Sequence, residues 1–97
     1  MLISFLIGYA IVYAIGAILE LCIEISSYYN AKAEIRQKAQ EAIGTDKDIF
    51  SLFVAQADKY IDKEVLVVKA FDKRRNQIAN IKVTAANGTP LRVGQRF

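Results

Sequence analysis

The sequence predicts an α+β membrane protein with a single N-terminal transmembrane helix and a helical stalk. These precede a module in which an amphipathic helix packs on a small three-stranded antiparallel sheet. Three observations carry this prediction. Residues 1–19 contain no charge, residues 30–43 are rich in strong helix formers, and the last third of the chain alternates apolar and polar residues. The expected divisions are an anchor at 1–25, a stalk or interfacial helix at 26–44, and an α+β module at 45–97.

Composition limits what the chain can be. At 97 residues it has room for one modest domain beside an anchor. It contains no histidine and a single cysteine, Cys22, which excludes an internal disulfide and a cysteine-only metal site. No phosphate-binding loop or nucleophile motif is present. We therefore expect no catalytic residue, no metal and no cofactor, and a protein that is not an enzyme.

The anchor prediction rests on length and on flanking charge. A membrane span needs about 20 apolar residues, and the uncharged run followed by further apolar positions up to residue 25 supplies them. Lys32, Arg36 and Lys38 follow the run and no basic residue precedes it. The positive-inside rule then predicts an integral membrane protein with its N-terminus outside. Its C-terminal module would be cytoplasmic, or on the corresponding side of a virion membrane. A cleaved signal peptide and a buried core helix are the alternatives.

One ridge of this predicted helix carries the candidate contact residues. Positions four apart are mostly small at first and acidic later. Small residues at this spacing allow another helix to approach closely in lipid. The predicted helix-packing residues are Ser4, Gly8, Val12 and Gly16. The predicted interfacial residues are Glu20, Glu24, Tyr28 and Tyr29. The two glutamates could instead pair with a basic partner in an assembly, or line an ion path.

The module at 45–97 is predicted to begin with a helix at about 46–62. Thr45 is a capping residue, and apolar side chains then recur at helical spacing. These apolar positions are Ile49, Leu52, Phe53, Ala57, Tyr60 and Ile61. Strands are predicted at about 64–71, 78–85 and 90–97, because these segments are β-rich or alternating and are separated by a polar loop and by an Asn-Gly turn signal.

The module also carries most of the positive charge. All 13 lysines and arginines follow residue 31, and the net charge is +3. The predicted basic patch consists of Lys73, Arg74, Arg75, Lys82, Arg92 and Arg96. It could bind nucleic acid or anionic lipid, although a solvated sheet face explains the same charges.

The functional expectation is a non-catalytic, single-pass structural protein that scaffolds a larger membrane-associated assembly. It would link a virion membrane to a capsid, or serve as an accessory subunit of a membrane complex. Its expected partners are the lipid bilayer and other protein subunits, including further copies of itself. One alternative is a tethered basic module that binds nucleic acid or anionic lipid. Another is a small pore-forming, holin-like oligomer lined by Glu20 and Glu24.

Overall fold

The described part of the chain forms a five-stranded mixed sheet with one helix against it. The computed structural model describes residues 11–15, 18–26, 28–45, 47–86 and 89–97. The sheet order is β1-β2-β5-β4-β3, with β2 and β5 parallel and the other neighbours antiparallel. The elements in chain order are β1 (Ile11–Ile15), β2 (Ile18–Ile25), α1 (Ala31–Ile43), β3 (Ser51–Lys59), β4 (Glu64–Phe71) and β5 (Gln77–Ala85).

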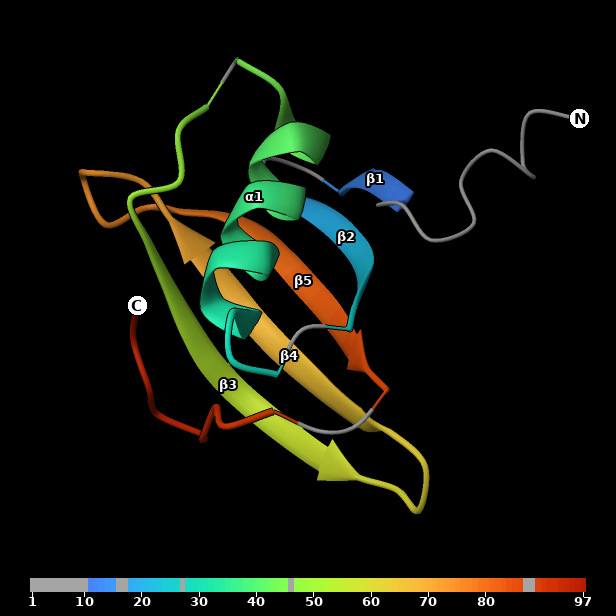
Figure 1. Cartoon of the computed structure of the whole chain (residues 1–97). Coiled ribbons are helices and arrows are strands. Elements are labelled where there is room, and N and C mark those ends of the chain that lie inside the picture. The colour runs from blue at the N-terminus through green and yellow to red at the C-terminus, as the bar shows by residue number, and fades with distance from the viewer. Residues whose placement is uncertain (1–10, 16–17, 27, 46, 87–88) are drawn as a thin grey trace, which may run out of the picture.

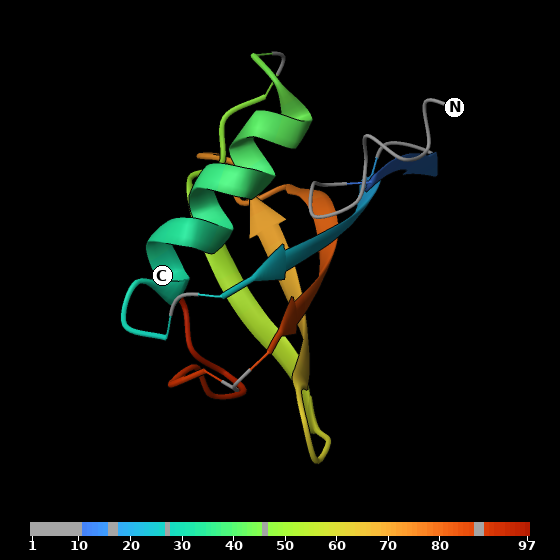
Figure 2. The ribbon, with the colours of Figure 1, turned by 45° about the vertical axis from the view of Figure 1, so that its right-hand side comes forward.

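The core lies between helix α1 and the face of the sheet that it covers (Figures 1 and 2). Alternate residues of β2, β5, β4 and β3 point to this face, as period-two geometry requires. Figure 2 shows α1 on one side of the strongly twisted sheet. The largest core side chains include Leu21, Ile23, Ile35, Leu52, Leu66 and Ile81.

Strand β2 overturns the predicted transmembrane helix at 1–25. Leu21, Ile23 and Ile25 are buried, whereas Cys22 is half-buried and Glu24 is exposed. The segment therefore follows a strand period of two. Glu20 and Glu24 are four residues apart, a spacing that puts two residues on one face of a helix and also on one face of a strand. The predicted continuous helix is wrong because these residues pair with β5 on one side and β1 on the other.

The expected membrane localisation rested on the same helix. Within the described part of the chain, no helix combines the length and the apolar character that a bilayer crossing requires. The assignment as a single-pass membrane protein, in a virion membrane or any other, is therefore corrected. So is the predicted sidedness, which depended on the same helix.

Helix α1 lies within the predicted stalk at 26–44, but it packs on the sheet and does not extend from it as a stalk would. Its apolar residues form a stripe at steps of four: Ala31, Ile35, Ala39 and Ile43 are all buried against the sheet. Two alanines and two isoleucines suffice in such a narrow stripe because the sheet supplies the larger side chains. Gly44 follows the helix at φ 79° and donates its amide to the carbonyl of Gln40 at 2.9 Å.

The predicted helix at 46–62 is also wrong, because residues 51–59 form strand β3. Leu52 and Val54 are buried with the spacing of a strand. A β-bulge between Val54 and Gln56 then adds one residue, so that Ala57 packs against the core in place of residue 56. The core-facing positions are therefore 52, 54 and 57. Because their spacing is not a strict period of two, the pattern resembles that of an amphipathic helix.

The predicted strands at 64–71 and 78–85 correspond to β4 and β5, which pair antiparallel. The predicted three-stranded antiparallel sheet is nevertheless wrong. Residues 90–97 do not lie beside β5 as a third strand. Instead, this segment pairs with the outer edge of β3: Phe97 exchanges two backbone hydrogen bonds with Leu52, and Val54 donates to the Gln95 carbonyl and accepts from the Gly94 amide. The Asn87–Gly88 turn signal lies outside the described residues.

Two polar side chains of α1 tie the helix to the segments around it. Arg36 donates three hydrogen bonds to backbone carbonyls, at 3.1 Å to Ile49, 3.4 Å to Phe50 and 3.0 Å to Phe97. Gln40 donates to the carbonyls of Gly44 and Lys47 and accepts from the amide of Ile49. The approach to β3 and the C-terminal segment are thus held by one face of the helix.

Replacement of Arg36 should therefore destabilise the fold. We expect Arg36→Gln to lower the free energy of unfolding by about 2 kcal/mol, because hydrogen bonds to a charged donor are lost and part-buried carbonyls lose their partner. Urea denaturation measures this change. The matched control is Arg92→Gln at an exposed position, which should stay within about 0.5 kcal/mol of the parent. Equal effects of the two substitutions would contradict the role given to Arg36.

Glu64 provides a second test of the packing, since it is a buried charged residue at 2 % exposure. Its Oε1 accepts from the amide of Thr89 at 2.8 Å and from the hydroxyl of the same residue at 3.2 Å. We expect Glu64→Ala to cost about 2 kcal/mol of stability, because both donors lose their acceptor. Glu64→Gln should cost less, since its amide oxygen still accepts. Thermal denaturation of the two variants would refute this account if Gln were the more damaging.

Candidate functional site

The structure divides the six residues of the predicted basic patch among three places. Lys73, Arg74 and Arg75 lie in the turn between β4 and β5. Lys82 lies on β5, on the sheet face away from α1, where it lines a different depression from Arg75 and Arg96. Arg92 and Arg96 lie in the C-terminal segment. Arg75 and Arg96 are the pair that comes together, and they line a depression of about 450 Å³.

Aromatic side chains surround this pair of arginines. Phe50 and Ser51, at the start of β3, and Phe71, at the end of β4, line the same depression. Phe53 is next to it, because its backbone forms a bridge with Arg96. In both ribbon views the start of β3, the β4–β5 turn and the C-terminal end lie on the same side of the molecule (Figures 1 and 2). The arginine–phenylalanine cluster is Phe50, Ser51, Phe53, Phe71, Arg75 and Arg96.

Arg96 is held in place by contacts with three side chains. Its guanidinium carbon lies 5.2 Å from the ring centroid of Phe53 and 5.3 Å from that of Phe71, which are cation–π distances. Its Nη1 donates to the Ser51 hydroxyl at 3.1 Å. A guanidinium has five N–H donors, so this arrangement fixes the group and leaves further donors for a ligand.

Arg75 is positioned by the turn that precedes β5. The Asp72 side chain accepts from the amides of Arg74 and Asn76, both at 2.9 Å, and the Arg75 amide donates to the Asp72 carbonyl at 3.0 Å. This turn requires φ 67° at Arg75, the one non-glycine residue with a positive φ in the described part of the chain. Glycine or asparagine is the usual residue at such a position. An arginine there adds a second cation to the depression at a cost in backbone strain.

The charge of the cluster is not balanced by its own lining. None of the five residues around the depression is acidic, and neither arginine forms an ion pair with a described carboxylate. The nearest acidic residue in sequence, Asp72, directs one carboxylate oxygen to the amides of its own turn. The cluster therefore presents two guanidinium groups, a hydroxyl and aromatic rings to a ligand. That donor set suits anions that also carry a flat or apolar part.

The sheet face away from α1 contains a larger depression of about 1050 Å³. Its floor includes Cys22, Val65 and Val67, and its rim carries Glu20, Asp58, Lys63 and Lys82. Glu20 accepts a hydrogen bond from the Asn80 amide at 2.8 Å. Since acidic and basic residues both line this depression, it has no single electrostatic preference. Among the described residues, no group of three acidic, histidine or cysteine side chains is placed to hold a metal ion.

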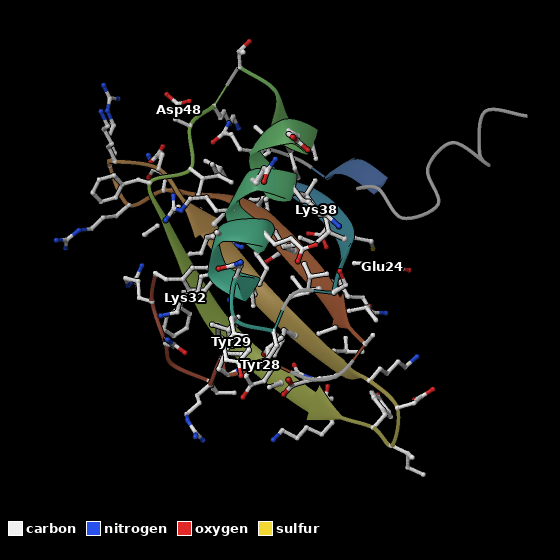
Figure 3. The ribbon with its side chains drawn as sticks, viewed as in Figure 1. Glu24, Tyr28, Tyr29, Lys32, Lys38 and Asp48 are labelled. Carbon is white, nitrogen blue, oxygen red and sulfur yellow. The ribbon has the colours of Figure 1, made fainter. Side chains whose placement is uncertain are left out.

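Those of the predicted helix-packing and interfacial residues that the structure describes do not share one helical ridge. Ser4, Gly8 and Gly16 lie outside the described residues, and Val12 belongs to β1, where it pairs with Leu21. Figure 3 shows Glu24 beside Lys38, whose ammonium donates to the Glu24 backbone carbonyl. The rings of Tyr28 and Tyr29 contact each other edge to face near the start of α1, with centroids 5.1 Å apart.

The sequence reasoning missed the aromatic half of the cluster. It placed Phe53 on the buried face of a helix and gave no role to Phe50, Ser51 or Phe71. A strand reading of residues 51–53 would have put Ser51 and Phe53 on one face, opposite the buried Leu52. Their proximity to Arg96 had no local signal, because it comes from the pairing of two segments 45 residues apart.

The strained turn gives a direct test of the Arg75 geometry. We expect Arg75→Gly to raise the free energy of unfolding by about 0.5–1 kcal/mol, because glycine adopts a positive φ without the steric cost that a side chain adds. Chemical denaturation measures the change, and Arg74→Gly in the same turn is the matched control. A loss of stability in Arg75→Gly as large as that in the control would show that the turn does not strain Arg75.

The cluster is thus assembled from three parts of the chain that are distant in sequence: the start of β3, the β4–β5 region and the C-terminal segment. Its cations face a common depression and are fixed by a turn on one side and by aromatic rings on the other. No family model matches the chain, and no curated protein or solved structure matches it either.

Proposed function

We propose that the protein is a non-catalytic binding component of a larger assembly, and that it contacts an anionic partner through the arginine–phenylalanine cluster. The observation that carries this proposal is the meeting of Arg75 and Arg96 at one depression that no acidic residue lines. Two guanidinium groups brought to one place by different segments give a site for phosphate, sulfate or carboxylate groups.

The surrounding charge supports the same direction. Lys73 and Arg74 are exposed in the turn that carries Arg75, and the chain as a whole has a net charge of +3. Long-range attraction from such a basic region raises the rate at which an anionic partner is captured. A scattered set of surface lysines would do this as well. The fixed guanidinium of Arg96 adds directional hydrogen bonding, which free surface lysines do not supply.

Strand β2 supports a binding function over the pore that the sequence suggested as an alternative. The pore required Glu20 and Glu24 to line a helix within a membrane. Both residues belong to β2, where the Glu20 carboxylate bonds with Asn80 of the neighbouring strand. An acidic protein surface also fits the cluster, because guanidinium groups bind carboxylates with the same geometry as phosphates.

Binding of a polyanion tests whether the cluster is a specific site or only part of a generally basic surface. We expect the full chain to bind heparin with an affinity that falls steeply with salt, because ion contacts dominate such binding. The double substitution Arg75→Asn with Arg96→Gln should weaken binding by about tenfold or more, as expected for loss of two charge-assisted contacts. Asparagine is chosen at residue 75 because it tolerates the positive φ. Fluorescence titration at several salt concentrations is the measurement.

The matched control is Lys63→Gln with Lys82→Gln. It removes the same number of positive charges from exposed positions around the other depression. Its heparin affinity should stay close to that of the parent protein, and circular dichroism checks that all variants are folded. If the two double variants lose affinity equally, binding depends on net charge alone and the cluster is not the site.

A further inference from the structure

We infer that the anionic partner is single-stranded nucleic acid, with phosphates held by Arg75 and Arg96 and an unpaired base stacked on Phe50. This inference rests on the proposed function and names the ligand of the same cluster. It follows from a difference among the three phenylalanines of the cluster. Two of the rings already contact the Arg96 guanidinium, and the third is exposed to solvent.

Two of the rings hold a protein group. Phe53 and Phe71 each lie against the Arg96 guanidinium, at 5.2 and 5.3 Å from its central carbon. These rings therefore position the cation that would meet a phosphate. Together with the bond to Ser51, they orient the plane of the guanidinium before any ligand arrives. Preorganisation of this kind reduces the entropy lost on binding.

The third ring is exposed. Phe50 lines the same depression as both arginines, and 59 % of its surface is open to solvent. Its backbone is fixed on both sides: the amide donates to the Phe71 carbonyl at 2.8 Å, and the carbonyl accepts from Arg36 at 3.4 Å. An apolar ring on a fixed backbone beside two cations is the arrangement with which proteins bind single strands, by stacking bases and contacting phosphates.

The combination discriminates among anions. A duplex keeps its bases inside the stack, so it could use the arginines but not the ring. A lipid headgroup offers phosphate but no flat aromatic surface. A single strand offers both within one nucleotide. The depression of about 450 Å³ brings the arginines and Phe50 together at one place on the surface.

The test uses the full chain and a fluorescently labelled oligothymidylate, followed by fluorescence anisotropy over a range of salt concentrations. Competitors are an abasic strand of the same length, a duplex and phosphatidylserine vesicles. We expect the oligothymidylate to bind about tenfold or more tightly than the abasic strand, since stacking of one base contributes about that factor. Duplex and vesicles should compete weakly.

The variants assign the two contacts separately. Phe50→Ala should weaken oligothymidylate binding by about tenfold without changing its salt dependence, because it removes stacking and no charge. Phe50→Trp should bind at least as tightly as the parent, and it keeps the test decisive if the alanine variant does not fold. Arg75→Asn should reduce the slope of log affinity against log salt by about 0.7, the value for one phosphate contact with a single strand.

The outcomes separate this inference from the proposed function. Equal affinity for the abasic strand and the oligothymidylate, with cluster-dependent heparin binding intact, overturns the nucleic-acid ligand and leaves an anion site. Stronger competition by vesicles than by oligothymidylate overturns it in favour of lipid headgroups. Unchanged affinity in Phe50→Ala also overturns it. Absence of salt-sensitive binding to heparin and to every strand overturns both proposals.

Discussion

The Arg36 guanidinium is the contact on which the arrangement of the chain around helix α1 depends. One side chain bonds the carbonyls of Ile49, Phe50 and Phe97, which are 13, 14 and 61 residues away. The first two fix the entry into β3, and the third fixes the segment that closes the outer edge of that strand. Since Phe50 and Arg96 belong to these two segments, the same side chain that stabilises the fold also sets the two sides of the arginine–phenylalanine cluster.

The proposed binding site lies at a sheet edge, and the C-terminal segment is what makes this possible. An edge strand usually exposes unpaired backbone groups. Here the C-terminal segment pairs with Leu52 and Val54 and so satisfies part of the edge of β3, while its own residue Arg96 is carried across the rings of Phe53 and Phe71. The segment thus has a structural role through its backbone, and its Arg96 side chain supplies one cation of the proposed anion site.

The parts of the fold that could be predicted from sequence are those with local signals. Residues 64–71 are rich in β-branched side chains, residues 78–85 alternate, and residues 31–43 contain good helix formers with an apolar stripe. The N-terminal prediction was wrong because an apolar strand with glutamates four residues apart satisfies helical spacing too. The prediction of a helix at 46–62 was wrong for a different reason, since the bulge after Val54 shifts the apolar positions of the strand by one residue.

Of the candidate site, Arg75 and Arg96 were predicted as part of a wider basic patch. The sequence did not show that they lie apart from Lys82 and next to phenylalanines, because both facts depend on pairing between distant segments.

The parallel pairing of β2 with β5 has a consequence for the order in which the chain folds. The pairing joins residues about 60 positions apart, as the Glu20–Asn80 contact shows. During synthesis, β2 emerges long before the strand that it pairs with, and α1 emerges before most of the sheet that it covers. The β3–β4–β5 meander has only near neighbours to find, so it is the natural nucleus. Until the meander exists, β2 can pair with its near neighbour β1 but not with β5, so one edge of this apolar strand stays exposed and the nascent protein is a candidate for chaperone protection.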